Sequence, residues 1–378
     1  MYLYEAKIDL LIVIYFYIHI YYMIIIFIIV VMILFFKNLS QLTEFFSYRL
    51  CKKRYVKGLH GKLLKKNNFV RTNNNDWDLY LPCGYKYVEG EITKLNLNNK
   101  KNKYIFGISG SDQIASKNNL WKILKNYYGF SDACDIMPTT YILNDPSDMI
   151  LFKKNYKPDK SYILKKNLQR KKGLKLMKND DNIISYANKH KYKVIQEYIE
   201  NPFLVNGYKL NIRVFMLVVC SNNTKKIYMH KSGKCLYTSK KYKNNLVFHN
   251  NITSYYSNKS IYNTNPLSLE QLRMYLNNNN ISDVVVINRI RFVMVKLANA
   301  IRNVLCKKSV LNNVTTFQLF GIDIILDNKL RPLILEINKG PNMIPVNNAD
   351  KQLKETIYKD VYNNVNIINS PFNGFDEL

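Results

Sequence analysis

The chain of 378 residues lacks several motifs that carry chemistry in other proteins. No two of its six cysteines have the C-x-x-C spacing of zinc sites and redox motifs. No Ser/His/Asp or Cys/His arrangement for nucleophilic catalysis is seen, and no internal repeat. We therefore expect scattered reduced thiols, as in a cytosolic protein, at Cys51, Cys83, Cys134, Cys220, Cys235 and Cys306.

Acidic residues are scarce relative to basic ones. The chain has 27 Asp and Glu against 56 Lys and Arg, which gives a net charge of +29. Such a charge attracts nucleic acid, a membrane surface or an acidic peptide. Lys, Asn, Ile and Tyr are abundant along the whole chain, so a general bias of composition explains much of the excess. Because no RRM, zinc-finger or helix-turn-helix signature is present, we predict no nucleic-acid partner.

A long apolar run covers residues 10–36 and is broken mainly by His19. It exceeds the roughly 20 residues needed to cross a bilayer, and it lacks the small-residue cleavage site of a signal peptide. We predict that residues 1–36 form a transmembrane anchor; a buried helix and a misassigned start codon are the alternatives. Basic residues are concentrated after the run, which places the rest of the chain in the cytoplasm.

The apolar pattern after this run predicts a mixed α+β (α/β) fold. Residues 37–155 resemble a small mixed domain, with a strand near Leu79–Leu81 and a helix at 117–128. From about residue 160 the pattern becomes dense. It predicts strands at Tyr162–Leu164, Val194–Ile199 and Arg213–Cys220, a helix at Val284–Leu305, and a hairpin of Phe317–Leu326 with Pro332–Ile337.

The hairpin carries three side chains with oxygen donors. Asp323 is a single charge inside an apolar strand, and Glu336 and Asn338 lie two residues apart, hence on one face of the next strand. A buried carboxylate is costly unless it is paired or binds a metal. Three oxygen donors on paired strands suit Mg²⁺. A salt bridge from one carboxylate to Lys or Arg is the alternative.

Basic residues on earlier strands could meet a nucleotide. Lys165 ends a strand and precedes a cationic loop that contains Lys172 and Gly173. Lys209, Asn211 and Arg213 share one strand face. Singly, each lysine is better explained as a solvated surface charge; the case for a nucleotide rests on the order and spacing of these residues. An extended hinge with backbone groups for an adenine edge is predicted at Gln196, Glu197, Tyr198 and Ile199.

Two long strings resemble the tubulin–tyrosine ligase-like family. They are VIQEYIENPFLVNGYKLNIRVFMLVV and FQLFGIDIILDNKLRPLILEINKGPNM, and YILKKNLQRKKGLKLM resembles the family's phosphate loop. The resemblance implies an ATP-grasp fold with a central subdomain at 156–206, a C-terminal subdomain at 207–362 that holds Mg²⁺, and a tail at 363–378. Residues 37–155 then correspond to the family's N-terminal domain.

The resemblance also implies roles for single residues. ATP would be bound by Lys165, Lys172, Gly173, Gln196, Glu197, Tyr198, Ile199, Lys209, Asn211, Arg213 and Thr253. The metal would be held by Asp323, Glu336 and Asn338, and the catalytic residues would be Arg213 and Glu336. Phosphoryl transfer needs mainly positioning and charge neutralisation, which such a set provides.

Some positions depart from the family pattern. Asn211 stands where the family usually has Asp, Lys166 replaces a Pro, and Lys171 replaces a loop Gly. Tyr237 stands where many members carry an Arg near the acceptor. These departures leave acceptor identity open.

The resemblance implies an ATP-dependent ligase that adds Glu, Gly or Tyr to a protein tail through an acyl-phosphate. Tubulin or another acidic tail would be the acceptor, and a free amino acid the co-substrate. We predict a membrane-anchored enzyme whose catalytic domain faces the cytoplasm, associated with the cytoskeleton. A membrane-anchored nucleotide-binding pseudoenzyme or scaffold, and a ligase with a non-tubulin acceptor, are the alternatives.

Overall fold

The structure is a computed structural model. It describes residues 18–32, 46–51, 58–84, 88–95, 103–168, 173–178, 182–221, 224–245, 247–253, 259–307 and 314–378. The chain divides into two compact units, Met1–Phe46 and Ser47–Leu378.

In the first unit, residues 18–32 form a helix with exposed side chains. Among the described residues, no helix is both long and apolar enough to cross a membrane. The transmembrane anchor predicted at 1–36 is therefore not supported; the rest of the apolar run, 10–17 and 33–36, lies outside the described residues.

Ten of the described strands in the second unit form one large sheet, in the order β14-β11-β10-β12-β4-β3-β1-β2, with β13 paired to β12 and β9 to β10. Strands from both ends of the unit share this sheet, because β4 pairs in parallel with β12. Their bounds are β1 (Ser47–Leu50), β2 (Val70–Arg71), β3 (Leu79–Leu81), β4 (Lys103–Phe106), β9 (Leu204–Val205), β10 (Tyr208–Ser221), β11 (Thr224–Tyr237), β12 (Val314–Leu326), β13 (Pro332–Asn338) and β14 (Phe375–Glu377).

A second sheet of four antiparallel strands has the order β5-β8-β6-β7. Its strands are β5 (Thr140–Ile142), β6 (Ser161–Lys165), β7 (Leu174–Lys178) and β8 (Val194–Glu197). Two helices, α6 (Pro146–Asn155) and α7 (Ile183–Lys189), pack on it through a small apolar core. Asp145 caps α6, since its carboxylate accepts hydrogen bonds from the N–H groups of Ser147 and Asp148.

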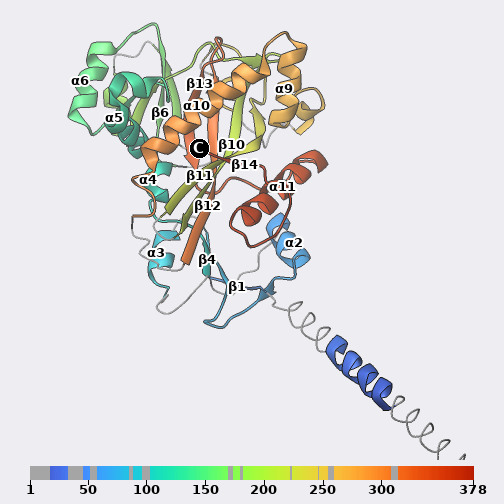
Figure 1. The fold of residues 1–378 in the computed structure, drawn as a ribbon. Helices are drawn as coiled ribbons and strands as arrows, with labels where there is room; N and C mark the ends of the chain where they lie inside the picture. The colour runs from blue at the N-terminus through green and yellow to red at the C-terminus, as the bar shows by residue number, and fades with distance from the viewer. Residues whose placement is uncertain are drawn as a thin grey trace, which may run out of the picture. The chain divides into compact units, whose positions relative to one another are not determined.

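The main core lies against one face of the large sheet. Strand β10 directs Leu210, Ile212 and Val214 into this core, as the two-residue period of a strand requires. Helices α5 (Lys117–Cys134), α9 (Leu269–Asn278) and α10 (Asp283–Ile301) supply the other side. Figure 1 shows α10 crossing the strands of this sheet.

Helices α2 (Gly58–Lys66) and α11 (Asn348–Asn364) lie side by side (Figure 1). They meet through His60 on α2, whose ring stacks on Tyr358 with ring centroids 4.8 Å apart. The His60 Nε2 also lies 2.5 Å from the Tyr362 hydroxyl. The remaining short helices are α3 (Val88–Thr93), α4 (Ser111–Ala115), α8 (Phe248–Asn251) and the 3₁₀ helix η1 (Lys259–Asn263).

The mixed α/β fold is confirmed, and so are the hairpin of β12 and β13 and the buried strand now seen as β10. The subdomain boundaries at 155/156 and 206/207 stay predictions. The expectation of six reduced cysteines is wrong, because the fold brings distant pairs together: Cys51 is bonded to Cys83, and Cys220 to Cys306. Cys134 and Cys235 are free.

Candidate active site

One cavity of about 700 Å³ gathers most of the predicted site residues. They come from both sheets and from the segment before η1. The predicted residues that line it are Lys165, Gln196, Glu197, Tyr198, Ile199, Lys209, Asn211, Arg213, Thr253, Asp323, Glu336 and Asn338. Residues far apart in the sequence are therefore neighbours in one hollow, as the resemblance required.

Of the two predicted members of the phosphate loop, only Gly173 is described, and it is not among the residues that line the cavity. Gly173 lies at the start of the strand after that loop, and its C=O accepts a hydrogen bond from the Lys166 N–H at 2.9 Å. Its φ of +76° is a conformation that suits glycine. Lys172 lies outside the described residues.

The acidic centre of the cavity is built by paired strands. Asp323 on β12 is directly opposite Glu336 on β13. Arg213 on β10 donates two hydrogen bonds to the Asp323 carboxylate, from Nε at 2.7 Å and from Nη2 at 2.8 Å. The Asn338 amide lies 3.4 Å from the same carboxylate. The donor set of two carboxylates and one amide oxygen fits Mg²⁺, a hard cation that prefers oxygen.

A lysine that the sequence did not reveal pairs with the second carboxylate. Lys117, the first residue of α5, is buried, and its ammonium lies 3.2 Å from Glu336 Oε2. Burial alone would raise the pKa of Glu336, but the ammonium groups of Lys117 and Lys165 outweigh it and hold this pKa below its usual value. Glu336 is thus kept ionised, as a metal ligand must be.

Two further lysines point into the cavity while almost fully buried. Burial is the main cause that lowers the pKa of Lys165 to about 8. Burial, followed by repulsion from Lys165, lowers the pKa of Lys209 to about 7. Lys209 Nζ donates to the Tyr198 hydroxyl at 2.7 Å. Because these ammonium groups are poorly solvated, a nearby anion such as a phosphate stabilises their charged form strongly.

The hinge is held in place by the four-stranded sheet. Gln196 donates its side-chain amide to the Thr140 hydroxyl at 2.7 Å. The N–H groups of Glu197 and Tyr198 donate to the C=O groups of Thr139 at 2.8 Å and Ser161 at 2.9 Å. This segment is therefore fixed before any ligand arrives.

Asn211 presents an acceptor without a partner. Its Nδ2 donates to the Thr253 hydroxyl at 2.9 Å, but its buried Oδ1 has no hydrogen-bond partner among the described residues. Such a group costs free energy unless a ligand satisfies it. A hydroxyl of a bound nucleotide would do so, which is an independent sign that the cavity fits one.

The far wall of the cavity was also missed by the sequence. It consists of Gly58, Leu59 and His60 at the start of α2, Tyr358 on α11, and Gly340–Pro345 in the segment that joins β13 to α11. We call residues 340–346 the cavity loop. Only tertiary contacts bring these segments to the site, so no local pattern could have identified them.

Strand β11 faces the cavity with a different residue from the one expected. Tyr237 is buried, and its hydroxyl donates to the Pro266 C=O at 2.9 Å, away from the cavity. Its neighbour Leu236 lines the cavity instead. No cation from this part of β11 therefore reaches the cavity wall.

Comparison with known proteins agrees with this geometry. The model of the tubulin-tyrosine ligase family matches residues 96–373. The chain belongs to the tubulin-tyrosine ligase family. This family is part of the ATP-grasp superfamily, which accounts for a site built between two sheets.

Several curated relatives are tubulin-modifying enzymes by name. The probable alpha-tubulin polyglutamylase Ttll1 of Tetrahymena thermophila is 26% identical over 257 residues, which is 60% of this chain and 59% of that protein. Tubulin polyglutamylase ttll-4 of Caenorhabditis briggsae is 26% identical over 71% of this chain and 47% of its own length. The human tubulin monoglutamylase TTLL4 is 25% identical over 78% of this chain and 25% of its own length. The chain thus spans less than two thirds of each of these relatives.

Proposed function

We propose that this chain is an ATP- and Mg²⁺-dependent ligase that joins an amino acid to an acidic protein tail, with tubulin as the acceptor. The names of the relatives support tubulin as acceptor and glutamate as the amino acid. Glycine and tyrosine remain alternatives for the added residue. Action on tubulin would place the protein at the cytoskeleton.

The observation that carries this proposal is the meeting of oxygen donors and cations in one cavity. Asp323, Glu336 and Asn338 would hold Mg²⁺, which supplies neutralisation of charge on phosphate oxygens. Lys165 and Lys209 would bind the phosphates. Arg213, which pairs with Asp323 on the neighbouring strand, would stabilise negative charge as the phosphoryl group moves.

The reaction would proceed in two steps. An oxygen of the acceptor carboxylate attacks the terminal phosphorus of ATP, and ADP leaves with the electrons of the broken P–O bond. The amine of the amino acid then attacks the acyl carbon, inorganic phosphate leaves, and the amine loses a proton. The chain's task is to position both substrates and to balance charge.

A second candidate is a nucleotide-binding protein without ligase activity. It is favoured by one observation: the apolar Leu236, with Tyr237 turned away, occupies the part of β11 where many family members carry an Arg. A ligase with a non-tubulin acceptor is the third possibility and uses the same site.

The test combines nucleotide binding with ligation. Thermal unfolding of the full chain would be measured with ATP, with and without Mg²⁺, and incorporation of radiolabelled Glu, Gly or Tyr would be measured with tubulin. We expect a Mg²⁺-dependent stabilisation and incorporation of glutamate. Stabilisation without any incorporation would favour the second or third candidate, and absence of stabilisation would refute all three.

A further inference from the structure

A row of four charged side chains crosses neighbouring strands of the large sheet. Glu336 on β13 is opposite Asp323 on β12, Asp323 is opposite Arg213 on β10, and Arg213 is opposite Lys234 on β11. Directly paired residues point to the same face of a sheet. Lys234 therefore extends the proposed catalytic row by one strand, although the proposed function gives it no role.

Lys234 is buried in a cluster with two residues of α11. Its ammonium lies 2.6 Å from Asp350 Oδ2, and the Lys354 ammonium lies 2.8 Å from the same oxygen. The exposed fractions of Lys234, Asp350 and Lys354 are 3%, 0% and 1%. Burial, followed by repulsion from Lys354, lowers the pKa of Lys234 to about 8.

This cluster holds two positive charges against one negative charge. Among the described residues, Asp350 is the only carboxylate in ion-pair distance of either ammonium. Burying an extra charge is costly, and apolar side chains would pack α11 on the sheet at lower cost. The arrangement therefore points to a purpose other than packing.

The cluster also fixes the cavity loop, residues 340–346. Lys354 Nζ donates to the Ile344 C=O at 2.7 Å, and the Val346 N–H donates to Asp350 Oδ2 at 2.9 Å. No helix or strand runs through this loop, and the Ile344 side chain is 71% exposed. The Ile344 side chain thus contributes little to the position of the loop, whereas the buried cluster contributes two charge-assisted hydrogen bonds to its backbone.

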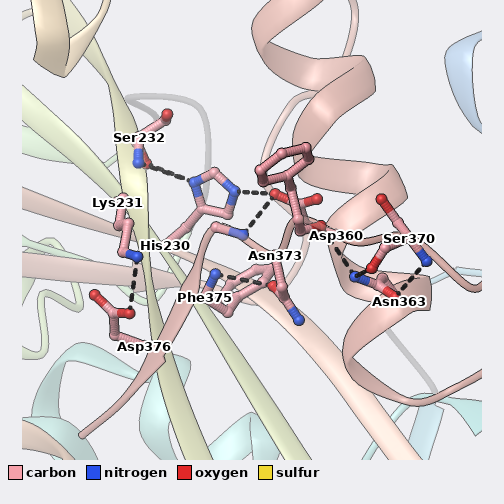
Figure 2. Close-up of polar contacts among 11 residues, drawn as sticks. His230, Lys231, Ser232, Asp360, Asn363, Ser370, Asn373, Phe375 and Asp376 are labelled. Atoms are coloured by element: carbon pink, nitrogen blue, oxygen red, sulfur yellow. Dashed lines mark hydrogen bonds and ion pairs between the residues drawn. The ribbon is translucent and has the colours of Figure 1, made fainter.

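Helix α11 is a firm support for this arrangement because it is also tied to β11 near its other end. His230 Nε2 on β11 lies 3.0 Å from Asp360 Oδ2 (Figure 2). The Gly374 N–H donates to the same carboxylate at 2.9 Å. The loop is therefore positioned relative to β11, the strand that carries Lys234.

We propose that Lys234, Asp350 and Lys354 are positioning residues that hold the cavity loop for the second substrate. Residues 340–345 line the cavity, and none of the predicted ATP-binding residues belongs to this loop, so we assign this wall to the other substrate. The excess positive charge behind it favours a group that bears a carboxylate. This inference rests on the proposed ligase function for the identity of that substrate.

The experiment uses the full chain with Lys354→Met, which removes the loop bond and leaves Lys234 and Asp350 as a balanced pair. Lys351→Met is the matched control, because that lysine lies on the same helix with its side chain 44% exposed. We expect the rate of amide hydrogen exchange in residues 340–346 to rise roughly tenfold, because one charge-assisted hydrogen bond is lost. KM for the amino acid or acceptor should rise by a similar factor, while ATP affinity stays within about twofold.

Unchanged loop exchange in a folded Lys354→Met protein would overturn the proposal, and so would equal increases in KM for all substrates. If that variant does not fold, hydrogen exchange in the wild-type protein decides: a Val346 N–H that is not protected from exchange would refute the proposed role of the cluster in holding the loop. If the wild type shows no ligation with any amino acid, the proposed function fails, but loop exchange still tests the positioning.

Discussion

Glu336 is the residue on which the proposed chemistry depends most directly. Glu336→Gln keeps the shape of the side chain but removes the charge that a divalent cation requires. We expect ligation to be abolished while the protein still folds; the thermal unfolding midpoint should fall modestly, because the buried Lys117 loses its ion-pair partner. Incorporation of radiolabelled amino acid measures the first effect. Unchanged turnover would refute the metal assignment.

Lys117 is the residue whose role the sequence did not suggest. Its ammonium lies 3.2 Å from Glu336 Oε2, and Lys117 lines the cavity in which we propose that the phosphates bind. Lys117→Met should weaken ATP binding by roughly tenfold, because one charge-assisted hydrogen bond to the phosphates is lost. Calorimetric titration measures this, with the exposed Lys122→Met on the same helix as control. Equal affinity in both variants would remove Lys117 from the site.

Lys209 should make both stability and ATP binding depend on pH. Its pKa is about 7 in the folded protein and roughly 10.4 when unfolded. Between these values the unfolded state binds more protons, so the free energy of unfolding rises with pH. A bound phosphate favours the charged ammonium, so ATP affinity should fall as pH rises above about 7.

This dependence is measured by thermal unfolding and ATP titration of the wild type and Lys209→Met. Groups that do not interact with Lys209 affect both proteins alike, so the difference between the two profiles reports Lys209 together with its repulsion of Lys165. We expect a shallower profile in the variant. Identical profiles would contradict the low pKa.

At the residue scale, the sequence predicted what a strand's own pattern reveals. Asp323, Glu336 and Asn338 interrupt apolar strands, and the two-residue period places Glu336 and Asn338 on one face. Lys117 gave no such signal, since one lysine among 56 basic residues is unremarkable in position. It reaches Glu336 only through the packing of α5 against the sheets.

At the scale of elements, β10, β12 and β13 were predictable because their apolar runs are continuous. Strand β11 and helix α11 were not predicted. Basic residues interrupt β11, and α11 is rich in Lys, Asp and Asn. Their buried polar side chains are stable only as pairs, Lys234 with Asp350 and His230 with Asp360, so neither element shows its burial when considered alone.

The contact of β11, α11 and the C-terminal strand gives an element-scale prediction. An added Cβ at Gly374 would lie 2.5 Å from His230 Nε2 and 2.7 Å from Asp360 Oδ2. Gly374→Ala should therefore lower the free energy of unfolding by about 1–3 kcal/mol. Chemical denaturation measures this. Gly84→Ala is the control, since nothing lies within 4 Å of its added Cβ; equal stability of the two variants would contradict the tight contact.

At the scale of the whole molecule, the family and the mixed fold were predictable, whereas the disulfides and the far wall of the cavity were not. The family's motifs are contiguous stretches of sequence, so they can be identified without knowledge of the fold. The disulfides and the wall join segments that only the folded chain brings together, such as Cys220 with Cys306.

The second unit should fold and bind nucleotide without the residues that precede it. The apolar cores described above and the cavity residues lie within Ser47–Leu378. Deletion of residues 1–36 should leave the thermal transition and its shift by ATP and Mg²⁺ unchanged. Deletion of residues 1–66 is the contrasting variant: it removes β1 and α2, with the buried Leu59 and Leu64 and the cavity residue His60, and should abolish the ATP shift. Loss of the shift in the shorter deletion would show that residues before Lys37 contribute to the site.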